Sequence, residues 1–124
     1  MHRVGLVLDA GGSALALSAC LASVAAERGL ALEKLEGSLG ADPLGALARD
    51  GSLPCSFASA LQQTAALALW ASKRAPKLRA ITVSSVPYHD AGAHAVLDIG
   101  IALATGVAYL RALTDAGASV DVAA

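Results

Sequence analysis

Three short apolar runs, each followed by a segment with helical spacing, divide the chain into three similar units. The runs cover residues 4–8, 34–40 and 78–83, and the middle one is the weakest. Such runs are typical of buried strands, and their alternation with helices predicts a parallel sheet with right-handed crossovers. We therefore predict an α/β fold of three βα units. The units span about residues 1–30, 31–76 and 77–118.

The first and last helices are predicted by apolar side chains that recur at three- and four-residue steps. The first begins near Ser13 and ends at Gly29, a residue type that favours the left-handed position after a helix. Its apolar face consists of Leu17, Cys20, Leu21 and Val24. The last helix has the strongest periodicity in the chain and ends at Gly117. Its apolar positions are Val96, Ile99, Leu103, Val107, Leu110 and Leu113.

Two more helices are predicted in the middle unit from residues that begin and end helices. Pro43 fits the first position of a short helix, and Gly51 would stop it. Ser56 is a good N-cap for a long helix that continues to Arg74. Pro76 cannot continue that helix and ends it. The strand of the middle unit is therefore followed by two helices.

The length of 124 residues allows one domain but not a complete (β/α)8 barrel, which needs eight units and about 250 residues. Three parallel strands alone leave unpaired apolar edges. We therefore predict that residues 1–124 form one partial TIM-barrel domain, or a small open sheet that self-associates through its edges. Residues 119–124 (SVDVAA) have the pattern of another helix start, which supports the partial barrel.

The composition argues against several kinds of partner. Hydrophobic residues make up 56% of the chain and charged residues 15%, where about 25% is usual. The net charge is −1 and aromatic residues are 3%, so the chain lacks the basic and stacking surfaces that nucleic acids require. The longest apolar stretch, residues 14–26, is too short to span a bilayer. Because no targeting segment is recognisable, we predict a cytoplasmic protein without a membrane partner.

An aspartate follows each of the three predicted strands, at Asp9, Asp42 and Asp90. The carboxyl ends of parallel strands share one edge of the sheet, so these carboxylates could bind a metal or exchange protons there. The simpler interpretation, which we favour, is that they cap the helices that follow. Cys20 and Cys55 show no metal-ligand spacing and are expected to be reduced, so we predict no metal site.

Tyr88, His89 and Asp90 form the only cluster of titratable residues in the sequence that resembles a catalytic site. They are the candidate catalytic residues. A histidine held by a carboxylate is fixed in one tautomer and can transfer protons. Adjacent residues in an extended loop point in opposite directions, however, so His89 and Asp90 need not touch. No serine or cysteine nucleophile is tied to them by a known motif. Catalysis and a purely structural role both stay open.

Three motifs together resemble the methylmalonyl-CoA mutase family, and its small (beta) subunit above all. They are GSLGADPLGALA at 37–48, YHDAGA at 88–93 and GVAYLRAL at 106–113, and the resemblance covers almost the whole chain. It implies an inner stretch of a (β/α)8 barrel that threads an acyl-CoA substrate, without the family's separate adenosylcobalamin domain. It also implies a heterodimer with a catalytic mutase subunit that interconverts (R)-methylmalonyl-CoA and succinyl-CoA by radical rearrangement.

Two positions depart from the catalytic chains of the family that the sequence resembles. Those chains read YHMQEAGA in the matching loop, and ungapped alignment on AGA at 91–93 puts Pro87 at the catalytic histidine and His89 at the glutamine. They also read GTIQND in the earlier strand, where the glutamine helps to bind substrate and this chain has Gly40. We therefore expect a noncatalytic, structural chain that binds no cofactor by itself.

Two rival hypotheses stay open. A shift of two residues in the alignment would place His89 at the catalytic position of an active mutase barrel fragment. Alternatively, the chain is an autonomous βα module that self-associates and has no enzymatic activity.

Overall fold

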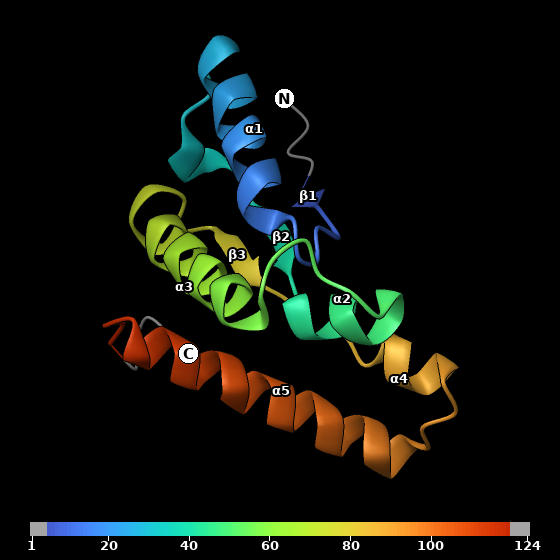
Figure 1. Cartoon of the computed structure of the whole chain (residues 1–124). Helices are drawn as coiled ribbons and strands as arrows, with labels where there is room; N and C mark the ends of the chain where they lie inside the picture. Colours follow the sequence, from blue (N-terminus) through green and yellow to red (C-terminus); the bar gives the residue numbers. More distant parts are fainter. Residues whose placement is uncertain (1–4, 120–124) are drawn as a thin grey trace.

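The computed structural model describes residues 5–119, and these residues contain a parallel sheet of three strands. The strands are β1 (Leu6–Val7), β2 (Gly37–Ala41) and β3 (Leu78–Ile81), in this order across the sheet. Because neighbouring strands are parallel, each connection crosses over through helices, as Figure 1 shows. The predicted α/β fold with a three-stranded parallel sheet is confirmed.

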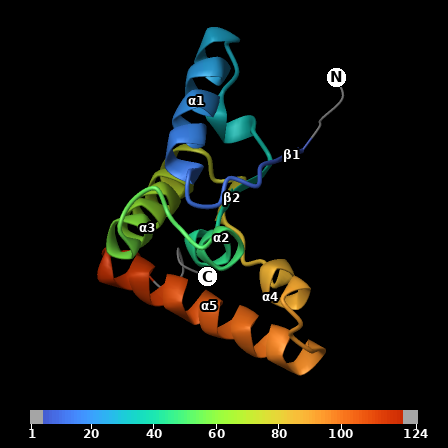
Figure 2. The ribbon, with the colours of Figure 1, turned by 45° about the vertical axis from the view of Figure 1, so that its right-hand side comes forward.

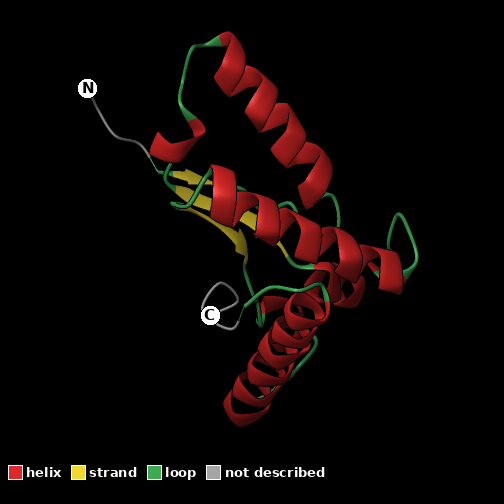
Figure 3. Ribbon diagram, turned by 90° about the vertical axis from the view of Figure 1, so that its left-hand side faces the viewer, coloured by secondary structure: helices red, strands yellow, loops and turns green. Residues whose placement is uncertain are grey.

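Helices cover one face of the sheet and leave the other open. α1 (Ala14–Glu27) and α3 (Phe57–Arg74) pack beside each other on the covered face (Figure 3). On the opposite face Val7 is 79% exposed. A long last helix packs across α3, away from the sheet (Figure 2). The other helical segments are η1, a 3-10 helix (Leu32–Lys34), α2 (Pro43–Asp50), α4 (Val86–Asp90) and the long last helix, α5 (Ala95–Asp115).

The residues predicted to begin and end the two middle helices do so. Ser56 caps α3, where its Oγ accepts the N–H of Ser59 at 3.2 Å. Pro43 is the first residue of α2, and Gly51 follows its last residue with a φ of +70°. α3 ends two residues before Pro76. These predictions are confirmed because they rest on local chemistry that tertiary packing did not override.

The strands differ in extent from the apolar runs that predicted them. β1 holds two residues, and Val4 lies outside the described residues. Lys34, at the start of the middle run, belongs to η1, so β2 begins at Gly37. β3 ends at Ile81, two residues before the end of its run. The helix start predicted at 119–124 lies outside the described residues except for its first position.

The core between the sheet and its two covering helices is built mainly from alanine. Its large enclosed side chains are Leu39, Leu67 and Leu78. The other buried members are Ala10, Ala14, Ala41, Ala71, Ala75 and Ala80. Small side chains let the helix backbones lie close to the sheet, so the packing is dense although each residue buries little apolar area.

The apolar face predicted for α1 points mostly outward. Leu17 and Val24 are 44% and 43% exposed, whereas the buried residues of the helix are Ala14, Ser18 and Ala25. Ser18 is tolerated inside because its hydroxyl donates to the carbonyl of Ala14 at 2.6 Å. The spacing thus predicted the helix correctly, but small residues rather than large ones face the sheet.

In α5, too, most of the predicted apolar positions point outward and not toward the core. Its buried residues are Thr105, Tyr109 and Leu113. Five of the six predicted apolar positions form an exposed outer stripe: Val96, Ile99, Leu103, Val107 and Leu110. With 21 residues and a mean hydropathy of 1.6, α5 could cross a membrane by length and composition alone, a test that core helices also pass. A helix that is apolar on both sides is typical of one covered on both sides.

Truncating one buried and one exposed leucine separates the core from the outer stripe. Leu39→Ala empties a fully enclosed site, so we expect the free energy of unfolding to fall by about 2–5 kcal/mol. Leu103→Ala is the matched control, because that residue is 67% exposed, and it should change this free energy by less than about 0.5 kcal/mol. Urea denaturation followed by the fluorescence of Trp70 measures both. Equal losses would contradict the exposure of the outer stripe.

Candidate functional site

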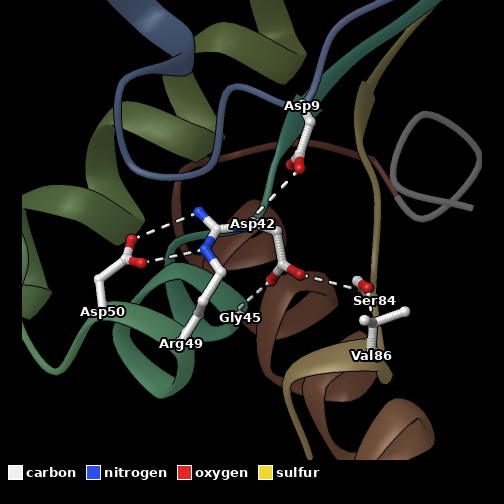
Figure 4. A network of polar contacts seen from close by, with 7 residues as sticks. All are labelled: Asp9, Asp42, Gly45, Arg49, Asp50, Ser84 and Val86. Atoms are coloured by element: carbon white, nitrogen blue, oxygen red, sulfur yellow. Dashed lines mark hydrogen bonds and ion pairs between the residues drawn. The ribbon is translucent and has the colours of Figure 1, made fainter. Parts of the chain in front are cut away.

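A cavity of about 410 Å³ lies at the carboxyl edge of the sheet, and we call it the rim cavity. Segments that follow all three strands form its wall, as the parallel topology requires. From the strand ends and α2 these include Asp9, Gly11, Asp42, Gly45, Arg49 and Ser84, several of which are drawn in Figure 4. α4 and the residue after it close another side with Val86, Pro87, Asp90 and Ala91.

The carboxylate of Asp42 is the centre of the hydrogen-bond network at this edge. Asp42 is 6% exposed and caps α2, where its Oδ1 accepts the N–H of Gly45 at 3.0 Å. Its Oδ2 accepts the backbone N–H of Ser84 at 3.1 Å (Figure 4). Oδ1 also accepts the hydroxyl of Tyr109 at 2.5 Å. One side chain thereby connects the ends of β2 and β3 with α2 and α5.

The hydroxyl of Tyr109 is fixed from two sides. It donates to Asp42 and accepts the backbone N–H of Leu44 at 2.9 Å. Burial of the phenol and its hydrogen bond to Asp42 raise the pKa of Tyr109 well above its ordinary value. The neutral phenol is therefore the form that the fold requires.

Arg49 links two further carboxylates at the rim cavity. Its Nε and Nη2 donate to Asp50 at 3.0 and 3.3 Å, and its Nη1 lies 3.6 Å from Oδ2 of Asp9 (Figure 4). The hydrogen bond with Asp50 and the charge of that carboxylate raise the pKa of Arg49 above its ordinary value. All three side chains are about half exposed or more, and exposed ion pairs contribute little to stability. The pairs orient the guanidinium without holding the fold together.

The three aspartates that follow the strands all line the rim cavity, but they play different parts. Asp42 caps a helix, so the capping interpretation is confirmed for this residue. It is wrong for the other two: Asp9 pairs with Arg49, and the carboxylate of Asp90 makes no hydrogen bond or ion pair with any described residue. Within residues 5–119, no group of three or more His, Cys, Asp or Glu side chains could hold a metal ion.

Tyr88, His89 and Asp90 lie in a short helix, α4, and not in the extended loop that we expected. The expectation was wrong because Pro87 at the start of α4 favours a helical turn. His89 is bound by Asp98 of α5, with 2.8 Å between Nδ1 and Oδ2. Only Asp90 of the trio belongs to the wall of the rim cavity. The three candidates therefore do not converge on one point.

Three residues that organise this region were not among the predicted site residues, although Tyr109 lies within the GVAYLRAL motif at 106–113. Ser84 acts through its backbone N–H, which any residue except proline supplies. Asp98 meets His89 only because the chain reverses between α4 and α5. Tyr109 is 67 positions away from Asp42. Besides its place in that motif, the position of Tyr109 inside an apolar helix was a signal, since a buried phenol usually finds a hydrogen-bond partner.

The backbone at Gly40 leaves no space for a side chain. Its φ is +67°, and an added Cβ would lie 2.0 Å from the carbonyl oxygen of Leu8. The pairing of β2 with β3 also shifts register between Ser38 and Ala41, on either side of this glycine. A larger residue at position 40 would require the segment after β1 to move.

The fold and the rim cavity define an α/β protein with a network of polar side chains at the carboxyl edge of a parallel sheet. A profile of the methylmalonyl-CoA mutase family matches residues 1–124, and the chain belongs to this family. The resemblance that the three sequence motifs indicated is thereby confirmed.

Relatives within the family are mutase subunits of much greater length. The chain is 46% identical over 123 residues to the methylmalonyl-CoA mutase small subunit of Streptomyces virginiae, an alignment of 99% of this chain and 19% of the relative. It is 37% identical over 122 residues to the probable small subunit of Mycobacterium tuberculosis, covering 98% and 19%. With the probable large subunit of that organism, identity is 28% over 121 residues, covering 98% and 16%. The chain thus spans less than a fifth of the length of these relatives.

Because the pKa of Tyr109 is raised in the folded state, we expect the fold to lose stability at alkaline pH. A group whose pKa is higher in the folded than in the unfolded state stabilises the fold fully at pH values below its unfolded pKa, about 10 for tyrosine. That contribution is lost as the pH rises through the folded-state pKa. We therefore expect the free energy of unfolding, measured by urea denaturation, to fall steadily as the pH is raised above 10.

Matched variants assign this effect to one of the two tyrosines of the chain. Tyr109→Phe should remove the contribution and lower the free energy of unfolding at neutral pH by about 2 kcal/mol, since a buried hydrogen bond to a carboxylate is lost. Tyr88→Phe is the control, and in it phenolate absorbance reports Tyr109 alone. Phenolate formation near pH 10 while circular dichroism still shows the folded state would contradict the assignment.

Proposed function

We propose that this chain is a segment of a methylmalonyl-CoA mutase small-subunit barrel of the (β/α)8 type, with a structural rather than a catalytic role. In this proposal it packs beside a catalytic subunit that interconverts (R)-methylmalonyl-CoA and succinyl-CoA. Identities of 46% and 37% with proteins named small subunit, against 28% with one named large subunit, support the choice of subunit.

The observation that carries the noncatalytic role is the backbone at Gly40. The family resemblance places the substrate-binding glutamine of catalytic chains at this position. Here the left-handed φ and the nearby carbonyl of Leu8 exclude any side chain. In this proposal the chain therefore lacks one substrate contact of the family. The backbone conformation of β2 at Gly40 would not accept the side chain that makes that contact.

The positions of Pro87 and His89 support the same role. Ungapped alignment puts Pro87 at the catalytic histidine of the family, and this proline lines the rim cavity with a side chain that has no proton to donate. His89 comes two residues later and contacts Asp98 instead of lining that cavity. An active fragment with His89 as the catalytic residue would need this imidazole to leave Asp98 and turn inward.

The rim cavity does not fit adenosylcobalamin by itself. The rim cavity, at about 410 Å³, has the volume of a site for a small ligand, far below what a corrin with its nucleotide requires. In the proposed assembly, the cofactor and the acyl-CoA therefore belong to the catalytic subunit. The chain contributes packing and subunit contacts.

The exposed apolar surface of the chain supports the proposal that it is one part of a larger folded subunit. α5 carries its outer stripe opposite its packed face, and β1 and β3 are free sheet edges in residues 5–119. Relatives of which this chain spans 19% have the additional length to cover such surfaces within one subunit or between two. We propose that this is how the outer stripe is buried in the complete enzyme.

The isolated chain should not convert methylmalonyl-CoA when adenosylcobalamin is supplied. The reason is the loss of both family positions that touch the substrate, at Gly40 and Pro87. Chromatographic detection of succinyl-CoA measures the reaction, with a complete pair of mutase subunits as the positive control. Turnover by the chain that disappears in His89→Ala would overturn the noncatalytic role and establish the active fragment.

The chain should associate with a mutase large subunit, and His89→Ala should leave that association unchanged. The imidazole is 68% exposed, and its hydrogen-bond partner within residues 5–119 is Asp98, so it holds no core packing. Leu103→Asp is the contrasting variant, since it puts a charge into the outer stripe, and we expect it to weaken binding at least about 10-fold. Analytical ultracentrifugation measures both. A chain that forms only its own stable oligomer would favour the autonomous βα module instead.

A further inference from the structure

α4 covers one side of the rim cavity without being built into the core. None of its residues is buried, although Val86, Pro87 and Asp90 belong to the cavity wall. The helix packs against α2 on one side and against the start of α5 on the other (Figure 2). A segment with no buried side chains lacks the contacts that resist local opening. α4 is therefore the part of the wall that can move most easily.

Both ends of α4 are suited to act as hinges. On the strand side, the N–H of Ser84 is held by Asp42 at 3.1 Å, so the fixed part of the chain ends one residue before Ser85. On the other side, Gly92 has a φ of +101°, and an added Cβ there would touch nothing within 4 Å. Glycine is thus required at this position by its backbone conformation and not by lack of space. α5 then begins anew with its own cap at His94.

One side-chain contact joins α4 to the long helix beside it. Among the described residues, the bond from His89 to Asp98 is the sole hydrogen bond or ion pair between a side chain of α4 and another helix. A carboxylate only accepts, so Nδ1 of His89 carries the proton and donates it. The imidazole is 68% exposed, whereas Asp98 is 15% exposed. Asp98 is therefore the more firmly held of the two residues, and His89 is the one that can move away.

Within residues 5–119, the carboxylate of Asp98 has His89 as its single hydrogen-bond donor. Its Oδ1 is buried and has no hydrogen-bond partner within the described part of the chain. When His89 leaves, Oδ2 loses its donor as well, and a carboxylate that is only 15% exposed is costly to leave without a protein donor. This cost favours the closed position of α4 although the helix itself buries nothing.

We infer that α4 is a hinged flap over the rim cavity and that the His89–Asp98 hydrogen bond is the latch that holds it closed. With the bond formed, Val86, Pro87 and Asp90 stay in the cavity wall. With the bond broken, the flap turns about Ser85 and Gly92 and opens the cavity beside Asp42. This role of His89 is mechanical and does not depend on the proposed place of the chain in a mutase.

Amide hydrogen exchange, resolved by nuclear magnetic resonance on the full chain, tests the latch. The amide to follow is Ala93, whose N–H lies beyond the hinge at Gly92 and donates to the carbonyl of Tyr88 in α4. In His89→Ala and in Asp98→Ala we expect it to exchange about 3- to 10-fold faster. The reference amide is Leu8, bound to the sheet at Ser38, and it should not change.

Two further variants decide whether the two residues act as one latch. The double variant His89→Ala with Asp98→Ala should exchange no faster than either single variant, because both remove the same bond. Asp90→Asn is the matched control, since it alters the neighbouring carboxylate of the same helix, and it should exchange as the wild type does. Unchanged exchange in the single variants, multiplied effects in the double variant, or equal acceleration at Leu8 would each overturn the latch.

Discussion

The buried carboxylate of Asp42 is the interaction on which the arrangement at the carboxyl edge of the sheet depends. Its donors are the start of α2, the loop after β3 and the phenol of Tyr109 on α5. A buried carboxylate must be satisfied by hydrogen bonds, and here each bond also fixes a different segment. Gly45 is part of the constraint, because a Cβ at this position would lie 2.3 Å from Oδ2 of Asp42. α5, which packs mainly against α3 and α4, is tied to the strand ends by this polar link.

The distribution of side-chain size explains why the link matters. The core under α1 and α3 is mostly alanine, which permits close approach but supplies little apolar area for each residue. Many larger apolar residues lie outside it, on the exposed sides of α1 and α5. The chain therefore has much of its potential hydrophobic stabilisation on surfaces that nothing within residues 5–119 covers. A fold of this kind is stabilised most when neighbouring elements of a larger body bury those surfaces.

Features that depend on neighbouring residues, such as helix starts and ends, could be predicted from the sequence. Features that depend on distant segments, such as the buried face of a helix, could not. Ser56, Pro43 and Gly51 acted as caps and stops because capping is local chemistry. The spacing of leucines also predicted α1 and α5, but it could not predict which side is buried, since only the sheet and α3 determine that. The partner of His89 was missed for the same reason: adjacency drew attention to Asp90, while the turn at Gly92 brings in Asp98. Asp42 was predicted as a cap, whereas its bond to Tyr109 spans two βα units and has no local signal.

The geometry of α4 relates the proposed loss of catalysis to the flap. Proline at position 87 fixes φ and favours the first turn of a helix, and it stands where the family resemblance places a catalytic histidine. The same residue that removes a proton donor from the cavity wall therefore also helps α4 to form. On that helix, His89 lies within reach of Asp98 and outside the cavity wall. Restoring histidine at position 87 alone would supply a side chain to a helical turn, while Gly40 would still exclude the second substrate contact. In our proposal the catalytic function is thus absent in two places, at the level of the side chain at Pro87 and at the level of the backbone at Gly40.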